Sequence, residues 1–217
     1  MANDVPKQRG AEAYLPPRIT LEALQDAVQG CRGCDLYRHA TRAVFGEGPR
    51  SASLLLVGEQ PGREEDLAGR PFVGPAGREL ERALAEARIP REEVYITNAV
   101  KHFKFTPRGK RRMHAKPNTS EVKACRPWLE AEIDLVKPAV LVLMGATAAQ
   151  ALLGAKFRVT KMRQVPLESE WAALTFATVH PSSILRVPDD EQRHAARQAF
   201  TEDFLLIAEH WRRLKAR

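Results

Sequence analysis

The chain of 217 residues lacks any long uninterrupted apolar run. A helix needs about 20 consecutive apolar residues to cross a bilayer, and no run approaches that length. The first 18 residues also lack the apolar core of a secretion signal. We therefore expect a cytoplasmic protein with no membrane partner, and we expect it to be a monomer. Residues 1–18 are predicted to form a flexible arm and residues 19–217 a single domain.

Cysteine is scarce, with Cys31 and Cys34 in a CxxC pattern and Cys125 far along the chain. An odd number of cysteines without a secretion signal argues against a disulfide framework. A thioredoxin-like redox pair is one interpretation, although the strand expected before such a CxxC is missing. Together with His102, the three thiols also match a structural zinc site or an iron–sulfur cluster, which spacing alone does not distinguish. A buried apolar thiol is the competing interpretation of Cys125.

Acidic residues are absent from residues 94–120, although the whole chain mixes both signs with a net charge of +7. The basic residues of this segment are Lys101, Lys104, Arg108, Lys110, Arg111, Arg112 and Lys116. A solvated surface normally mixes the two signs, so a segment of one sign favours contact with phosphate groups. We predict that residues 101–116 form the main nucleic-acid-facing surface. The competing interpretation is an ordinary basic protein.

The chain has neither a Walker A loop nor a GxGxxG motif, and it has no internal repeat. Four short apolar runs predict buried strands, at residues 53–58, 94–100, 139–145 and 175–180. Helical patterns occupy residues 20–29, 76–88, 119–136, 146–153 and 191–214. This alternation predicts an α/β fold, a three-layer α/β/α arrangement with a central, mostly parallel four-stranded sheet.

Binding sites on such sheets lie beyond the carboxyl ends of the strands. Glu59 and Gln60 follow the first predicted strand, Asn98 ends the second, and His180 follows the fourth. An Asn side chain offers both a donor and an acceptor, although a turn-forming Asn is the more common occurrence. The loop that follows the first strand contains Phe72, which suits either packing beneath the loop or stacking on a flat base.

Four segments in order resemble the uracil-DNA glycosylase superfamily, and their spacing is similar to that of family 4. They are GEQPG at 58–62, PFVGPAGREL at 71–80, TNAVKHF at 97–103 and HPSSILR at 180–186. Two departures resemble the UdgX branch, whose members become covalently linked to uracil-containing DNA through a histidine. His102 stands where family 4 usually has a fourth cysteine, and GKRRMH at 109–114 extends the segment that follows. Met113 stands where that branch has an isoleucine.

The resemblance implies a partner, uracil-containing DNA, preferably single-stranded, and a role for each site residue. His180 would donate to the uracil O2 and Asn98 would read the base edge. Phe72 would stack on the ring and Gln60 would contact the base. Glu59 would stabilise the sugar cation or orient the nucleophile.

His114 would trap the deoxyribose C1′ covalently after the N-glycosidic bond breaks. The residues expected on DNA are Lys110, Arg111, Arg112, Ser182, Ser183 and Arg186. A [4Fe–4S] cluster would be held by Cys31, Cys34, His102 and Cys125. Two alternatives stay open: a family 4 glycosylase that uses water, and a non-enzymatic nucleic-acid binding module stabilised by zinc.

Overall fold

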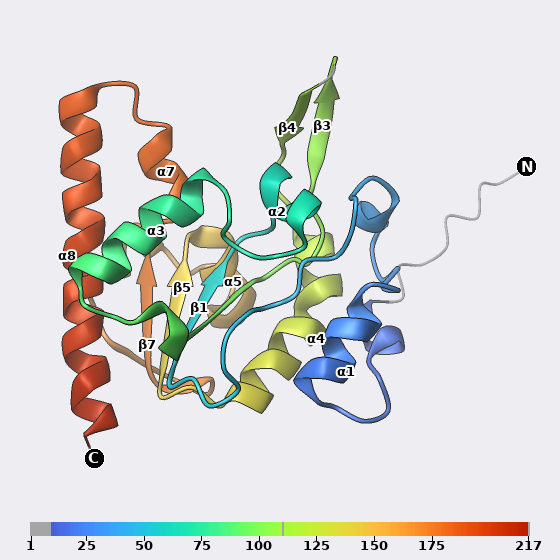
Figure 1. Ribbon diagram of the computed structural model, residues 1–217, viewed down its shortest axis with the longest axis horizontal. Helices are drawn as coiled ribbons and strands as arrows, with labels where there is room; N and C mark the ends of the chain where they lie inside the picture. Colours follow the sequence, from blue (N-terminus) through green and yellow to red (C-terminus); the bar gives the residue numbers. More distant parts are fainter. Residues whose placement is uncertain (1–9, 110, 217) are drawn as a thin grey trace, which may run out of the picture.

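The computed structural model describes residues 10–109 and 111–216, and its centre is a five-stranded sheet. The strand order is β2-β1-β5-β7-β6 (Figure 1). The parallel strands are β1 (Leu54–Gly58), β2 (Val94–Asn98), β5 (Val140–Met144) and β7 (Ala172–Thr178), and β6 (Leu167–Ser169) pairs antiparallel with β7. The predicted three-layer α/β fold is confirmed. The predicted strand number of four is wrong, because the short edge strand β6 has no apolar run to reveal it.

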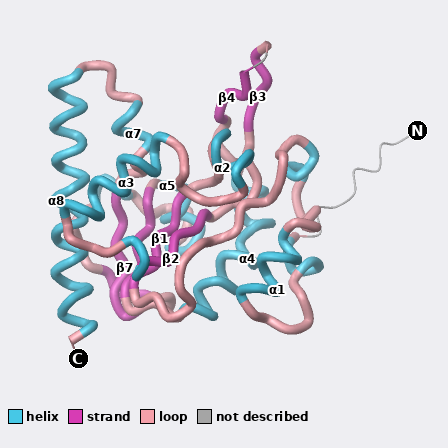
Figure 2. Tube along the Cα trace, viewed as in Figure 1, coloured by secondary structure: helices cyan, strands magenta, loops and turns pink. Residues whose placement is uncertain are grey.

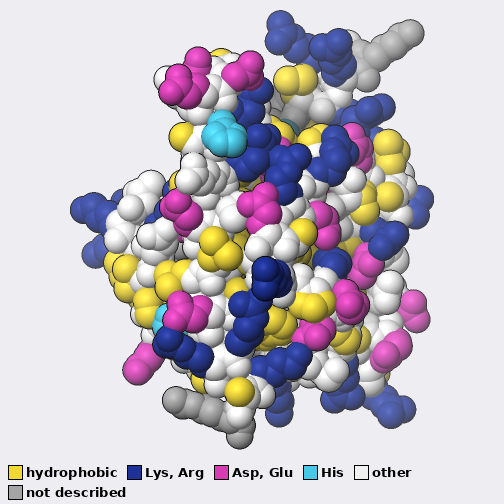
Figure 3. All heavy atoms as spheres, turned by 60° about the vertical axis from the view of Figure 1, so that its left-hand side comes forward, with side chains coloured by type: hydrophobic (Ala, Val, Ile, Leu, Met, Phe, Trp, Pro, Cys, Tyr) yellow, Lys and Arg dark blue, Asp and Glu magenta, His cyan; other side chains and the backbone are white. Residues whose placement is uncertain are grey.

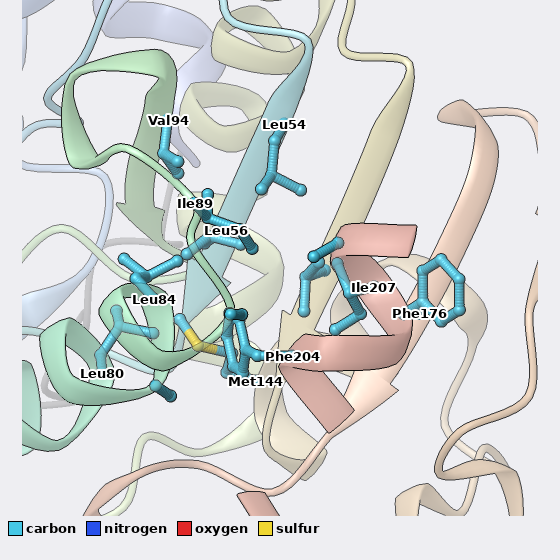
Figure 4. Packing of buried hydrophobic residues seen from close by; sticks show 14 of the residues in the cluster. Leu54, Leu56, Leu80, Leu84, Ile89, Val94, Met144, Phe176, Phe204 and Ile207 are labelled. Carbon is cyan, nitrogen blue, oxygen red and sulfur yellow. The ribbon is translucent and has the colours of Figure 1, made fainter. Parts of the chain in front are cut away.

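Alternate residues of the central strands point to opposite layers of helices. Leu54 and Leu56 pack with α3 (Pro75–Glu86) and α8 (Asp190–Lys215). Figure 4 shows this layer, with Leu80 and Leu84 of α3 facing the strand. Leu55 and Val57 pack instead with α4 (Thr119–Val136) and α5 (Ala146–Leu153). The continuous apolar runs in the sequence therefore reflect burial on both faces of the sheet.

The long helices begin where their capping residues predict. Thr20 Oγ1 accepts the Ala23 N–H at 3.1 Å at the start of α1 (Leu21–Val28). Asn118 and Glu121 exchange side-chain and backbone hydrogen bonds of 2.9 and 2.7 Å at the start of α4. This reciprocal pair is a capping box, and it satisfies two backbone donors that the first turn leaves open.

Short elements connect the layers. They are η1 (Ala11–Tyr14), η2 (Asp35–Arg38), α2 (Arg63–Ala68), η3 (Arg91–Glu93), α6 (Val159–Met162) and α7 (Ser182–Leu185). Residues 1–9 of the expected arm lie outside the described residues, and of residues 10–18 only Ala11 is buried. Ala11 is fully buried in an apolar cluster with Leu24 and Trp128. No helix in the described ranges is both long and apolar enough to cross a membrane.

An antiparallel hairpin occupies the basic segment that the sequence suggested to be a loop. Its strands are β3 (Phe105–Arg108) and β4 (Arg111–His114), and they stand out from the body in Figures 1 and 2. Gly109 has a φ of 56° at the turn, a conformation that glycine adopts without strain. Lys110, expected on DNA, lies outside the described residues.

Lys101 is fully buried, so the expectation that it belongs to the DNA-facing surface is wrong. Its ammonium group pairs with the equally buried Glu132 of α4. It also donates to Thr97 Oγ1 at 2.7 Å and to the Asn98 carbonyl at 2.8 Å. Glu132 in turn accepts from the Gly46 N–H at 2.8 Å. The pair therefore ties α4, the end of β2 and the segment before β1 together.

We expect Lys101→Met to lower the free energy of unfolding by about 3–5 kcal/mol, because it leaves Glu132 buried without a counter-charge. The double variant Lys101→Met/Glu132→Gln should lose less, since no charge is then stranded and the amide oxygen still accepts hydrogen bonds. Urea unfolding of both variants measures the difference. A double variant less stable than the single one would contradict this account.

Candidate active site

A cavity of about 470 Å³ lies at the edge of the sheet where β1, β2 and β7 end. Its walls come from distant segments because the carboxyl ends of parallel strands meet at one edge. The sequence-predicted residues that line it are Glu59, Gln60, Phe72, Asn98, His114, His180, Ser182 and Arg186. Arg111, Arg112 and Ser183, which were expected on DNA, are not part of its lining.

Asn98 and His180 each present a buried polar atom without a hydrogen-bond partner among the described residues. These atoms are Asn98 Oδ1 and His180 Nε2. Leaving such an atom unpaired costs free energy, so an orphaned atom beside a cavity points to a ligand that completes the bond. Only two other side-chain atoms of the described ranges are in this state, on Arg163 and Asp203, and neither residue lines the cavity.

His180 is held as the neutral tautomer that carries its proton on Nε2. The backbone N–H of Ser182 donates to His180 Nδ1 at 3.2 Å, and Ser182 Oγ lies 2.9 Å from the same nitrogen. Burial is the main cause that lowers the pKa of His180 to about 4, and the charge of Arg186 and the proximity of His114 contribute to the same shift. A neutral imidazole whose Nδ1 accepts a hydrogen bond must donate from Nε2.

Phe72 stacks beside His180, with ring centroids 5.9 Å apart and an interplanar angle of 30°. Its φ of 56° is unusual for an aromatic residue. Two glycines make room for it. A Cβ at Gly58 would lie 2.5 Å from Phe72 Cζ and 2.4 Å from Asn98 Oδ1, and one at Gly77 would lie 1.7 Å from the Phe72 carbonyl oxygen. The absent Cβ atoms therefore set the positions of both Phe72 and Asn98.

Gln60 holds the base of the β3–β4 hairpin. Its Oε1 accepts the Lys104 N–H at 3.0 Å, and its Nε2 donates to the carbonyls of Ala115 at 3.0 Å and Lys104 at 3.2 Å. Nε2 also lies 2.9 Å from His114 Nε2. The side-chain amide of Gln60 is thus engaged by the hairpin. Of the two contacts with the base that were expected at Gln60, through this amide or through a neighbouring backbone N–H, the first does not fit this arrangement.

Glu59 and His114 face each other across the cavity, with Glu59 Oε1 3.5 Å from His114 Nε2. The other carboxylate oxygen of Glu59 accepts the hydroxyl of Thr147, in the first turn of α5. Burial lowers the pKa of His114; Glu59 opposes this shift and Arg186 adds to it. His114 is therefore neutral at physiological pH, although 48% of its side chain is exposed. Thr147 was not predicted from the sequence. Its position shortly after the end of β5 could have indicated it as a candidate site residue.

Two further basic side chains of residues 101–116 form ion pairs with acidic side chains of other elements. Arg112 pairs with the buried Asp66 at 2.7 Å, and Lys104 pairs with Glu121 at 2.8 Å. The expected phosphate contact of Arg112 does not fit this arrangement, because its guanidinium group already anchors the hairpin to α2. Arg111 is exposed, and the Ser183 hydroxyl donates to the His180 carbonyl at 2.8 Å.

The rim of the cavity carries exposed cations. Arg186 lines the cavity and donates to Ser182 Oγ at 3.1 Å. Arg63, at the start of α2, also lines the cavity, and it was not among the residues predicted from the sequence. In Figure 3, Lys and Arg side chains gather on the upper part of the molecule, where the hairpin lies in Figure 1. The mouth of the cavity is therefore suited to an anionic ligand.

The cysteines and His102 do not line the cavity. All four are buried, and the three cysteines belong to one apolar cluster with residues of α1 and α4. The Trp128 indole N–H donates to Cys31 Sγ at 3.3 Å, and the Lys101 backbone N–H donates to Cys125 Sγ at 3.2 Å. Burial raises the pKa of Cys125 to about 12, although the charge and the backbone N–H of Lys101 act in the opposite direction. In residues 10–109 and 111–216, no three such side chains are grouped to hold a metal ion.

The chain belongs to the uracil DNA glycosylase superfamily, whose family model matches residues 45–205. Among curated relatives, it is 39% identical to a type-4 uracil-DNA glycosylase of Thermotoga maritima, over 80% of this chain and 87% of the relative. It is 35% identical to the type-4 enzyme of Archaeoglobus fulgidus, over 87% of this chain and 94% of the relative. A type-5 uracil-DNA glycosylase of Thermus thermophilus matches at 35% identity over 52% of this chain and 54% of the relative.

The depressed pKa of His180 predicts a loss of stability in acid. The folded chain keeps His180 neutral down to about pH 4, whereas the unfolded chain protonates it near the ordinary value of 6.5. The stabilisation is therefore complete above pH 6.5 and is lost as the pH falls towards 4.

We expect His180→Gln to flatten the pH dependence of the free energy of unfolding within this window. The slope should fall by at most about 1.4 kcal/mol per pH unit, the value for one proton. Urea unfolding at several pH values measures it, with His39→Gln, at an exposed histidine, as the control. An unchanged slope in His180→Gln would contradict the assignment.

Proposed function

We propose that this protein excises uracil from DNA by cleaving the N-glycosidic bond. The observation that supports this most directly is the pair of unpartnered atoms in the cavity, the acceptor Asn98 Oδ1 and the donor His180 Nε2. Uracil presents an N3–H donor between two carbonyl acceptors, which complements this pair. Cytosine has an acceptor at N3 and would leave Asn98 Oδ1 unsatisfied, a mismatch that disfavours its binding.

Cleavage of this bond places negative charge on the departing base and positive charge on the sugar. His180 Nε2–H donates to the uracil O2, where the negative charge develops. The carboxylate of Glu59, fixed by Thr147, stabilises the cationic sugar. Both interactions are stronger in a cavity that excludes water than at the surface. The base must leave the helical stack to enter this cavity, which favours single-stranded DNA.

We further propose that His114 traps the sugar, as the resemblance to the UdgX branch implies. The C1′–N1 bond breaks and its electron pair leaves with uracil. The lone pair of an imidazole nitrogen then forms a bond to C1′, and the resulting imidazolium loses a proton to solvent. The neutral state of His114 and its contact with Glu59 support this step. A nucleophile held in contact has a large effective concentration relative to water.

A second candidate is hydrolysis, in which water attacks C1′ and the enzyme turns over. The names of the matched relatives favour it, because two of them that match over most of their length are called type-4 uracil-DNA glycosylases. Both candidates share the recognition of uracil by Asn98 and His180. They differ only in the group that receives the sugar, so one variant series distinguishes them.

We expect His114→Ala to abolish a protein–DNA adduct that survives SDS and heat, because the attacking nitrogen is removed. Initial binding to single-stranded uracil-DNA should persist, since the Asn98 and His180 contacts remain. His114→Ser should admit water and release uracil over several turnovers. A denaturing gel and a uracil-release assay measure both outcomes, with His39→Ala as the control. Multiple turnover by the unaltered protein without adduct would establish hydrolysis instead.

We propose that Cys31, Cys34, His102 and Cys125 hold a [4Fe–4S] cluster. The support is the donor set itself, three buried thiols and a buried imidazole, with N–H donors on two of the sulfurs. Hydrogen bonds to the sulfurs are one of the factors that set the properties of such a cluster. A cluster at this place would be structural, because it would link the segment after α1 to α4.

Protein purified without oxygen should be brown and contain about four irons per chain. Cys125→Ser should lose the visible absorbance and lower the melting temperature, because one ligand is removed. Metal analysis and absorbance spectroscopy measure this result. Stoichiometric zinc without iron would contradict the cluster and favour a zinc site.

A further inference from the structure

A second hollow, which we call the α4–α5 groove, lies between the start of α4 and α5. Its volume is about 770 Å³, larger than that of the active-site cavity. Val122 of α4 and Ala151 and Leu152 of α5 contribute an apolar floor, and Lys116 and Lys123 lie on its wall. None of the functions derived so far uses this groove.

The groove adjoins the active site. Thr147 lines the groove, and its hydroxyl binds the carboxylate of Glu59 in the cavity. Lys116 follows His114 by two residues, and two residues of extended chain span at most about 7 Å. That length is comparable with one nucleotide of an extended strand. A strand whose uracil sugar lay against His114 and that left the cavity on this side would therefore pass Lys116.

The charge of the groove suits a phosphate backbone. Lys116 and Lys123 are at least partly exposed and have no ion-pair partner in the described part of the chain. Arg126 also lines the groove, but it pairs with Glu130 at 2.6 Å and lies over the ring of Trp171. Glu170 is the single acid among the lining residues. The two ammonium groups, which pair with no acid among the described residues, suit the phosphates of a DNA strand. The apolar residues of the groove suit its sugars and bases.

We propose that the α4–α5 groove binds the DNA strand on one side of the uracil nucleotide. Lys116 and Lys123 contact successive phosphates, and the apolar floor receives the sugar or the face of a flanking base. This inference rests on the proposed uracil excision and adds a one-sided binding site to it. The strand on the other side of the uracil nucleotide would contact Arg186 and Arg63, which line the active-site cavity.

The test uses two single-stranded oligodeoxynucleotides, one with about six nucleotides only on the 5′ side of uracil and one with the same number only on the 3′ side, a length within the site sizes typical of single-strand binding. The variant is Lys116→Glu/Lys123→Glu in the full chain. The control is Lys137→Glu, a charge reversal at the opposite end of α4, where Lys137 is the C-cap. Initial, non-covalent binding and uracil release are measured on both oligonucleotides, and urea unfolding verifies that each variant is folded.

The double variant should bind one of the two oligonucleotides several-fold more weakly and the other as before. For the affected oligonucleotide, the slope of log affinity against log salt should fall by about 0.7 for each phosphate that the variant no longer neutralises. Equal weakening on both oligonucleotides, the same weakening in Lys137→Glu, or no change at all would overturn the groove as a DNA site. If the unaltered protein releases no uracil from either oligonucleotide, the proposed function fails, and this inference fails with it.

Discussion

Lys101 links the end of β2 at the cavity to the buried cysteines. Its ammonium group donates to the Asn98 carbonyl, while the backbone N–H of the same residue donates to Cys125 Sγ. The ion pair with Glu132 keeps this residue inside the protein, where an isolated charge would be too costly. The position of Asn98 in the cavity and that of the buried cysteine are therefore set by one residue. Two direct hydrogen bonds of this one residue therefore connect the Asn98 carbonyl with Cys125 Sγ.

The basic segment illustrates why charge read along a sequence differs from charge in space. Residues 94–120 contain no acid, yet three of their basic side chains meet acids from other elements. Lys101 meets Glu132 and Lys104 meets Glu121, both of α4, and Arg112 meets Asp66 of α2. The acid-free run made these residues appear available to DNA, whereas they hold the hairpin and β2 to the body. Among the described residues of this segment, Arg108, Arg111 and Lys116 are exposed and pair with no acid, so they remain available for phosphate.

Strong local patterns made the fold predictable, and tertiary pairing limited the rest. The apolar runs located β1, β2, β5 and β7, and the residues following three of those strands line the cavity. Strand β6 was not predicted from the sequence because an edge strand need not be apolar. The β3–β4 hairpin was not predicted because its exposed strands carry charges instead of alternating apolar residues. The occupation of the Gln60 amide by Lys104 and Ala115 joins residues more than 40 positions apart, and no local pattern reports such a contact.

In the proposed reaction, the hairpin determines which acceptor meets the sugar. Without β3 and β4, Glu59 would face a cavity open to solvent, and water would be the nearest nucleophile for the cation that it stabilises. The hairpin ends at His114, and Gln60 fixes its base through three hydrogen bonds to the backbone of Lys104 and Ala115. Arg112 anchors the same strand through Asp66. An imidazole held in place loses little conformational entropy when it forms a bond, and His114 Nε2 lies 3.5 Å from Glu59 Oε1. The carboxylate would thus serve either proposed outcome, and the contacts that hold the hairpin support the proposed capture by His114.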